Sequence, residues 1–189
     1  MKSVEFISEQ SPNTIFGSFT KDLIGSKIWL CNILKKCYSQ PYNNVYILGS
    51  WYGNLAFILN KTKIDCDNII CVEIDKNALK TSEKLLTTVY PDDKLTFIHN
   101  DAKNLEYDKN GVVINTSVND MSTEWYENVP KGCIVVVQGR NDLKEPKTVI
   151  DNLEKLDKLF PMTEVAYLGS KKFVDPETQY NRYLKIGVK

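Results

Sequence analysis

Two glycines and a glutamate have the spacing that best fits a ligand site in this sequence. Gly49 and Gly53 follow the apolar run Val45–Leu48, and the apolar run Ile69–Val72 then leads to Glu73. Glycines after a strand let the backbone approach a ligand closely, and a carboxylate after the next strand can accept hydrogen bonds from ribose hydroxyls. The pattern predicts a site for an adenosine-containing ligand. The alternative for the glycines is a tight strand-to-helix turn without a ligand.

Glu73 is the acid for which a ligand role is expected. A carboxylate at the end of a buried strand is costly unless it is paired or exposed at the edge of the sheet. Ligands of doubly wound sheets bind at that carboxyl edge. Asp75 fits better as the N-cap of the helix that begins at Lys76, which leaves Glu73 for a ligand. The alternative is that Glu73 itself only caps this helix.

Polar segments after later apolar runs offer further chemistry. The segment 115–120 combines amide, hydroxyl and carboxylate side chains that can hydrogen-bond a polar group. Within it, Asp120 could act as a general base or orient a nucleophile. Gln138 ends another apolar run and could face a substrate. The alternatives are that Asp120 or Ser122 caps a helix at 123–127, and that Asp101, in the segment 100–102, lies in a surface turn.

Alternating strands and helices must position these residues. Near-continuous apolar runs are typical of buried parallel strands. The last two strands have only a loop with Gly169 and Ser170 between them, so we expect them to be antiparallel. The patterns predict strands at 45–48, 68–74, 95–98, 112–114, 133–137, 164–168 and 180–188, helices at 20–38, 54–60, 76–90, 123–127 and 146–160, and a loop at 40–44. The fold class is therefore α/β, a Rossmann-like three-layer sandwich.

Composition limits the class of protein. The chain has 189 residues, 42% hydrophobic and 25% charged, which suits a single folded domain. We expect an N-terminal arm or lid at residues 1–19 and one domain at residues 20–189. Lys+Arg and Asp+Glu both number 24, so the charge excess typical of nucleic-acid binding is absent.

Cysteine usage and hydropathy indicate a cytoplasmic protein. Five cysteines without a CxxC pair, together with a single histidine, predict no zinc or other metal site and buried, reduced thiols. No secretory signal or membrane-length apolar run is found in the sequence. The sequence does not indicate an oligomeric state.

This order of elements, closed by a strand hairpin, resembles the class I S-adenosylmethionine-dependent methyltransferases. Their seven-stranded sheet is mostly parallel, with one antiparallel strand from a C-terminal hairpin. The chain also resembles small, uncharacterised phage-type methyltransferases, which share its GSWYG (49–53), INTS (114–117) and RYLKIG (182–187) segments. For a viral protein, the implied location is the host cytoplasm.

The resemblance implies roles for particular residues. The turn with Gly49, Ser50, Trp51 and Gly53 would contact the methionine part of S-adenosylmethionine. Further cofactor contacts would come from Glu73 and Ile74 at the ribose, from Asp101 and Ala102 at the adenine, and from Asn115. Asp120 and Asn115 are the candidate catalytic residues, and Ser117, Asn119 and Gln138 the candidate substrate contacts. The segment Asp22–Lys27 could cover the cofactor.

The leading hypothesis is methyl transfer from S-adenosylmethionine to a small polar acceptor. A nucleic-acid methyltransferase is less favoured, because the charge is balanced and the Asn/Asp-Pro-Pro-aromatic run of amino-group DNA methyltransferases is missing after Ile114. A catalytically silent cofactor-binding or partner protein is a second alternative, favoured by Ile47, where the family usually has an acid. A nicotinamide oxidoreductase is disfavoured because no GxGxxG motif is present.

Overall fold

A computed structural model describes residues 19–174 and 179–189. The predicted arm at residues 1–19 lies outside the described part except for Phe19. The strands are β1 (Tyr42–Leu48), β2 (Cys66–Glu73), β3 (Leu95–His99), β4 (Val112–Asn115), β5 (Ile134–Arg140), β6 (Glu164–Val174) and β7 (Gln179–Val188). The helices are α3 (Lys21–Cys37), α4 (Asn54–Lys61), α5 (Lys76–Leu86), α6 (Glu124–Asn128) and α7 (Leu153–Leu159), with 3-10 turns η1 (Asp92–Lys94) and η2 (Ala102–Asn104).

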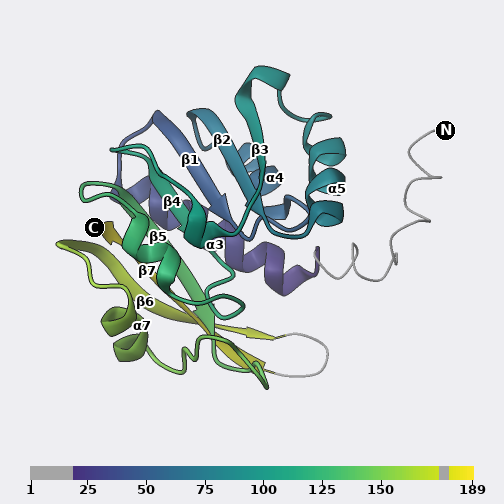
Figure 1. Cartoon of the computed structure of the whole chain (residues 1–189). Coiled ribbons are helices and arrows are strands. Elements are labelled where there is room, and N and C mark those ends of the chain that lie inside the picture. The colour runs from purple at the N-terminus through teal and green to yellow at the C-terminus, as the bar shows by residue number, and fades with distance from the viewer. Residues whose placement is uncertain (1–18, 175–178) are drawn as a thin grey trace.

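All seven strands form one sheet in the order β3-β2-β1-β4-β5-β7-β6 (Figure 1). Strands β1 to β5 are parallel to one another, whereas β7 runs antiparallel to both of its neighbours, β5 and β6. The predicted mostly parallel sheet with a C-terminal hairpin is therefore confirmed. The carboxyl ends of the parallel strands meet at one edge of the sheet, where ligands of such folds bind.

Helices cover both faces of the sheet. Side chains alternate along a strand, so Val45 and Ile47 of β1 pack under α3, α4 and α5, whereas Tyr46 and Leu48 face η2, α6 and α7. Each face has its own buried apolar cluster. The arrangement is the predicted three-layer sandwich.

The helix predicted at 146–160 is wrong in its first half. The chain runs without regular structure up to Asn152, whose side chain accepts a hydrogen bond from the backbone of Lys155 and caps α7. Thr148 is held instead by the loop after β4, because its hydroxyl donates to the Met121 carbonyl at 2.7 Å. These tertiary contacts outweigh the helical spacing of apolar residues.

Three predicted boundaries also need correction. Strand β1 already begins at Tyr42, within the predicted loop 40–44, because it pairs there with β2. Gly169 and Ser170 lie inside β6 rather than in a loop, since their backbones pair with β7. Helix α5 ends at Leu86, before the predicted stop at Pro91.

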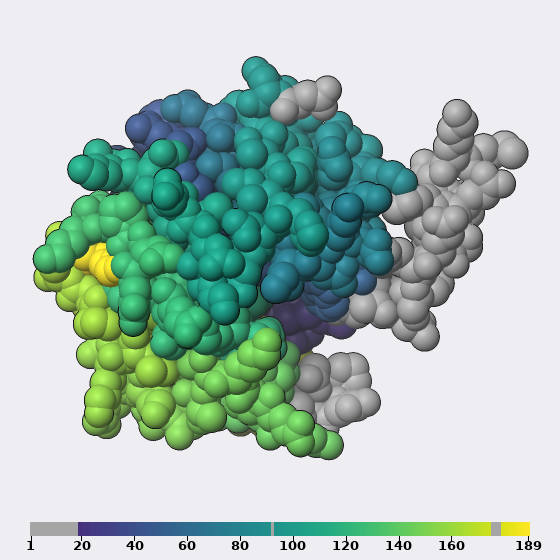
Figure 2. All heavy atoms as spheres, viewed as in Figure 1, coloured from purple at the N-terminus to yellow at the C-terminus, as the bar shows by residue number. Residues whose placement is uncertain are grey.

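The C-terminal residue is anchored to the middle of the chain. The ammonium of Lys189 donates to the carbonyls of Tyr126, Glu127 and Val129 at the end of α6. A cation at this position satisfies carbonyls that have no partner within the helix. In Figure 2 the yellow C-terminal end accordingly lies among green residues.

The five cysteines are free thiols, as predicted, and all but Cys37 are buried. Burial raises the pKa of the Cys31 and Cys66 thiols to about 11, so these thiols stay protonated near neutral pH. Among the described residues, no helix combines the length and the apolar content needed to cross a bilayer.

Two glycine-to-alanine substitutions should affect stability in opposite directions. At Gly187, a Cβ atom would lie 2.1 Å from the Glu164 carbonyl oxygen, so Gly187→Ala should lower the free energy of unfolding by about 1–3 kcal/mol. At Gly25, inside α3, a Cβ atom would meet only Phe173 at 3.6 Å, so Gly25→Ala should raise it by about 0.5–1 kcal/mol. Urea denaturation measures both changes. Equal effects of the two substitutions would contradict the packing described for β7.

Candidate functional site

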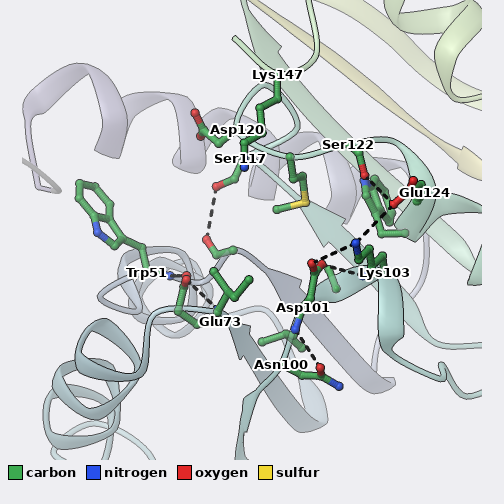
Figure 3. Close-up of a pocket in the computed structure, with 16 residues that line it drawn as sticks. Trp51, Glu73, Asn100, Asp101, Lys103, Ser117, Asp120, Ser122, Glu124 and Lys147 are labelled. Atoms are coloured by element: carbon green, nitrogen blue, oxygen red, sulfur yellow. Dashed lines mark hydrogen bonds and ion pairs between the residues drawn. The ribbon is translucent and has the colours of Figure 1, made fainter. Parts of the chain in front are cut away.

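A cavity of about 570 Å³ opens at the carboxyl edge of the sheet (Figure 3). The segments that follow β1, β2, β3 and β4 converge on it. This is the edge at which the sequence places the candidate ligand site. Eight of the predicted site residues line the cavity: Gly49, Trp51, Glu73, Ile74, Asp101, Ala102, Ser117 and Asp120.

Glu73 is fixed by three backbone amides. One carboxylate oxygen accepts from the Trp51 amide at 2.7 Å, and the other accepts from the amides of Ile74 and Asp75 at 2.9 and 3.0 Å. The residue is 8% exposed. A carboxylate offers about four acceptor positions, so one remains for a ligand.

Asp75, not Glu73, caps α5. Its carboxylate accepts from the amides of Asn77 and Ala78 at 2.8 and 3.2 Å. The capping role predicted for Asp75 is confirmed. The alternative in which Glu73 serves only as this cap is wrong.

The glycine turn has two parts with different purposes. Gly49 has φ +60°, and a Cβ atom there would lie 2.9 Å from Cβ of Ser117 across the cavity wall. Gly53 has φ +79°, but a Cβ atom there would meet Ser82 Oγ at 2.5 Å and thus obstruct the packing of α5. Gly53 does not line the cavity. A glycine is therefore required at position 53 because α5 packs closely against the turn.

Ser50 is a buried residue of the same turn. It is 2% exposed, and its amide donates to the Val72 carbonyl at 3.0 Å. Its buried hydroxyl has no hydrogen-bond partner among the described residues. Ser50 is not part of the cavity lining.

Ile74 and Ala102 give the cavity apolar surface. Ile74 is 66% exposed, and its carbonyl is hydrogen-bonded to the His99 ring at 2.9 Å. Asp101 lies beside them as the N-cap of η2, where its carboxylate accepts from the Lys103 amide at 3.1 Å. The Lys103 ammonium lies 3.9 Å from the same carboxylate, a solvent-exposed pair that adds little to stability.

Asn115 supports the cavity from behind. It is fully buried, its side-chain oxygen accepts from the Ser117 amide at 2.9 Å, and its side-chain nitrogen lies 3.1 Å from the Met121 sulfur. The Ser117 hydroxyl in turn donates to the Gly49 carbonyl at 3.3 Å. Asn115 therefore positions a cavity residue without lining the cavity.

Asn119 and Gln138 are engaged with the protein itself. The Asn119 amide group donates to the carbonyls of Arg140 and Thr148 and accepts from the Arg140 amide at 2.9 Å. Gln138 is fully buried and donates to the Ser26 carbonyl at 3.2 Å. Gln138 thus ties β5 to α3 and does not line the cavity, although the sequence suggested a substrate contact.

Asp120 lies at the rim of the cavity with an exposed side chain. Desolvation by the surrounding protein raises the pKa of its carboxyl, and Arg140 and Lys147 offset part of this effect. The capping alternatives for Asp120 and Ser122 are not met. Helix α6 begins after Thr123 without a side-chain cap.

A second cavity of about 250 Å³ adjoins the first. Gly49, Trp51, Ser117 and Asp120 line both cavities. The smaller cavity is also lined by Asn119 and by three basic residues, Lys27, Arg140 and Arg182. Sequence reasoning gave no role to Arg182. Its only local signal is a charged residue within β7, a strand that also contains Lys185.

Among the described residues, no group of three or more His, Cys, Asp or Glu side chains could hold a metal ion.

No protein-family model and no curated protein matches the chain. Solved structures do match it. One is magnesium protoporphyrin IX methyltransferase (ChlM) from Synechocystis PCC 6803 with bound SAM, with a TM-score of 0.60 and 12% identity over 87% of this chain and 77% of that one.

Two further structures give the same picture. A S-adenosylmethionine-dependent methyltransferase from Clostridium acetobutylicum ATCC 824 has a TM-score of 0.59 and 12% identity over 93% of this chain and 95% of that one. Trm5b from Pyrococcus abyssi has a TM-score of 0.61 and 18% identity over 90% of this chain and 50% of that one. The chain has the Rossmann-like fold of these methyltransferases.

Lys27→Met should change the pH dependence of stability. Burial, reinforced by Arg182, lowers the pKa of the Lys27 ammonium from 10.5 to about 7. Between these two values the unfolded chain binds a proton that the folded protein has released, so stability rises with pH. Removing this group should raise the free energy of unfolding at pH 7 by about 2–4 kcal/mol. The free energy of unfolding of the variant should then increase less with pH than that of the unsubstituted protein.

Urea denaturation at several pH values from 7 to 10 measures this effect. Lys36→Met is the matched control, because Lys36 is exposed on the same helix. An unchanged pH slope in Lys27→Met would show that the Lys27 ammonium is not desolvated.

Proposed function

We propose that this protein transfers a methyl group from S-adenosylmethionine to a small polar acceptor. The observation that carries the proposal is the cavity at the carboxyl edge of a methyltransferase-type sheet, with Glu73 held by three amides on its wall. Its volume of about 570 Å³ lies in the range of small-molecule sites.

The residues of the cavity fit the chemistry of this cofactor. Glu73 would accept from a ribose hydroxyl through its remaining acceptor position. Ile74 and Ala102 would contact the faces of the adenine, and Asp101 would accept from its exocyclic amine. A Cβ atom at Gly49 would collide with Ser117, so only a glycine fits there. Gly49 also lines the cavity, where its backbone could contact the methionine part.

S-adenosylmethionine supplies an electrophilic methyl group when bound, and the protein has to align the acceptor with it. Four residues line both cavities, so the acceptor would meet the methyl group at that boundary. Asp120 lies there and would accept the proton of the acceptor, a role for which a raised pKa is suited. Asn115 would act as a positioning residue through Ser117.

The second cavity supports a small acceptor. Its volume of about 250 Å³ is below that of most drug-sized sites. Nothing in the net charge of zero favours a nucleic-acid backbone as the partner. A small polar molecule that enters beside Asp120 therefore fits the site best.

Glu73→Ala should weaken the binding of S-adenosylhomocysteine at least tenfold, because a charge-assisted hydrogen bond to the ribose is worth roughly 1.5–3 kcal/mol. Glu73→Gln keeps the shape and one acceptor oxygen, so its loss should be smaller. Isothermal titration calorimetry measures both affinities. The control is Glu83→Ala on the exposed side of α5. If Glu73→Ala binds S-adenosylhomocysteine as tightly as the unsubstituted protein, Glu73 does not contact the ribose.

Asp120→Asn should lower the rate of methyl transfer by about 10²–10⁴, because an amide cannot accept the proton of the acceptor. In the unsubstituted enzyme the rate should fall as the pH drops through the raised pKa of Asp120, and the variant should lose this dependence. The assay follows tritiated methyl from S-adenosylmethionine into a small-molecule cell extract.

Asp67→Asn is the control for Asp120→Asn, because Asp67 is exposed near the opposite, amino end of β2. A full rate in Asp120→Asn, with the pH dependence retained, would contradict a role as general base.

A further inference from the structure

Three basic side chains from distant parts of the chain surround the smaller cavity. Lys27 comes from α3, Arg140 from the end of β5 and Arg182 from β7. Lys27 is 6% exposed and Arg182 is 2% exposed. Basic residues are almost never buried so deeply unless they are paired. The partners of each one therefore have to be accounted for.

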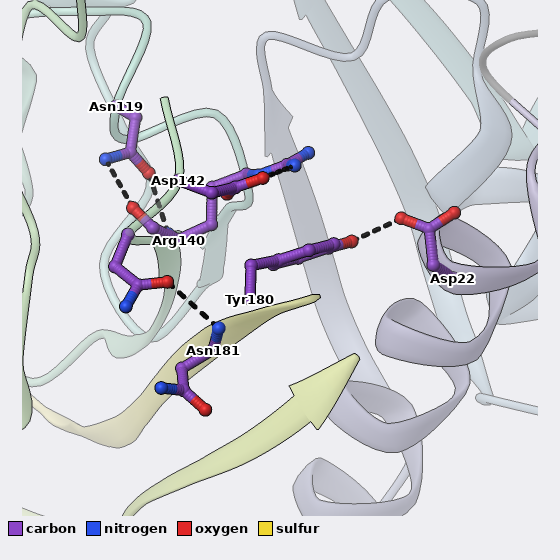
Figure 4. Close-up of polar contacts among 7 residues, drawn as sticks. Asp22, Asn119, Arg140, Asp142, Tyr180 and Asn181 are labelled. Carbon is purple, nitrogen blue, oxygen red and sulfur yellow. Dashed lines mark hydrogen bonds and ion pairs between the residues drawn. The ribbon is translucent and has the colours of Figure 1, made fainter. Parts of the chain in front are cut away.

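Arg140 has an acidic partner within the protein. Its guanidinium donates to both carboxylate oxygens of Asp142, through Nε at 2.5 Å and through a second nitrogen (Figure 4). It also stacks on the Tyr180 ring with 4.0 Å between the guanidinium carbon and the ring centre. The Tyr180 hydroxyl donates to Asp22, so this second acid is engaged as well.

Within the described residues, neither Lys27 nor Arg182 has an acidic partner, although the Arg182 guanidinium also lies over the Tyr180 ring, 5.4 Å from its centre. The ion pairs recorded within residues 19–174 and 179–189 involve neither of them. Arg182 donates weakly to Gln138 at 3.5 Å, and its buried Nε has no hydrogen-bond partner in the described part of the chain. Leaving a buried donor unpaired costs about 1–3 kcal/mol.

The charges around Lys27 do not compensate its burial. Arg182 and Arg140 repel the ammonium, whereas Asp22 favours its charged form more weakly than burial opposes it. Asp120 is on the cavity wall but is solvent-exposed at the rim. An oxyanion inside the cavity would supply the counter-charge that these groups do not provide.

We propose that the smaller cavity is a subsite for an anionic group of the methyl acceptor, a carboxylate or a phosphate, held by Lys27 and Arg182. This inference rests on the proposed function and specifies its substrate class. An arginine donates to two oxygens of such a group in one plane, and a lysine adds a point charge. The acceptor would then place its nucleophile toward Asp120, where the two cavities meet.

The position of the subsite favours the acceptor over the cofactor. The adenine-side residues Ile74, Asp101 and Ala102 line only the larger cavity. The buried Lys27 and Arg182 line only the smaller one, whereas the basic residues on the larger cavity are Lys103 and Lys147. The larger cavity, at about 570 Å³, has room for a complete drug-sized ligand. The smaller cavity is thus available to a second molecule.

Inorganic phosphate is the probe for this subsite. Calorimetric titration of phosphate into protein saturated with S-adenosylhomocysteine should show saturable binding, and Lys27→Met should weaken it at least tenfold. Arg182→Lys keeps a cation but loses the planar pair of donors, so it should also weaken binding. Lys36→Met, on the exposed side of α3, should bind phosphate like the unsubstituted protein. Acetate in place of phosphate distinguishes a carboxylate site from a phosphate site.

Other results would overturn the proposal. Absence of phosphate and acetate binding to the unsubstituted protein would do so directly, and so would equal binding to Lys27→Met. If Lys27→Met weakens S-adenosylhomocysteine tenfold but leaves 5′-methylthioadenosine, which lacks the carboxylate, unaffected, then the basic residues hold the cofactor's own carboxylate. Failure of S-adenosylhomocysteine to bind the unsubstituted protein would instead refute the proposed function.

Discussion

The shape of the ligand edge depends on one buried carboxylate. Glu73 joins the loop after β1, through the Trp51 amide, to the loop after β2, through the amides of Ile74 and Asp75. Hydrogen bonds to an ionised carboxylate are stronger than those between neutral groups. The same carboxylate keeps one acceptor position for a ligand. Glu73 thus holds the two loops together and also provides the proposed contact with the cofactor.

Much of the fold could be predicted because its signals are local. Apolar runs marked the five parallel strands, the missing helix before Tyr180 indicated the hairpin, and Asp75 was recognisable as a cap. The orientation of polar side chains, in contrast, is not determined by the neighbouring sequence. Asn115 is the last residue of β4 and Gln138 lies near the end of β5, yet both side chains hydrogen-bond to groups within the protein.

The basic cavity could not be predicted, because its residues meet only in the folded sheet. Arg182 and Lys27 line the same cavity because β7 lies antiparallel beside β5, and no spacing in the sequence encodes that neighbourhood. The helix expected from Pro146 failed for a similar reason. Its first half is bound by the loop after β4, through Thr148, which a periodicity of apolar residues does not reveal.

The most direct test of the central claim is calorimetric titration of the unsubstituted protein with S-adenosylhomocysteine and, separately, with NAD. A site built around Glu73 for the methyltransferase cofactor should give saturable one-to-one binding of S-adenosylhomocysteine and no heat with NAD. Binding of NAD without binding of S-adenosylhomocysteine would contradict the account and assign the cavity to a different adenosine-containing ligand.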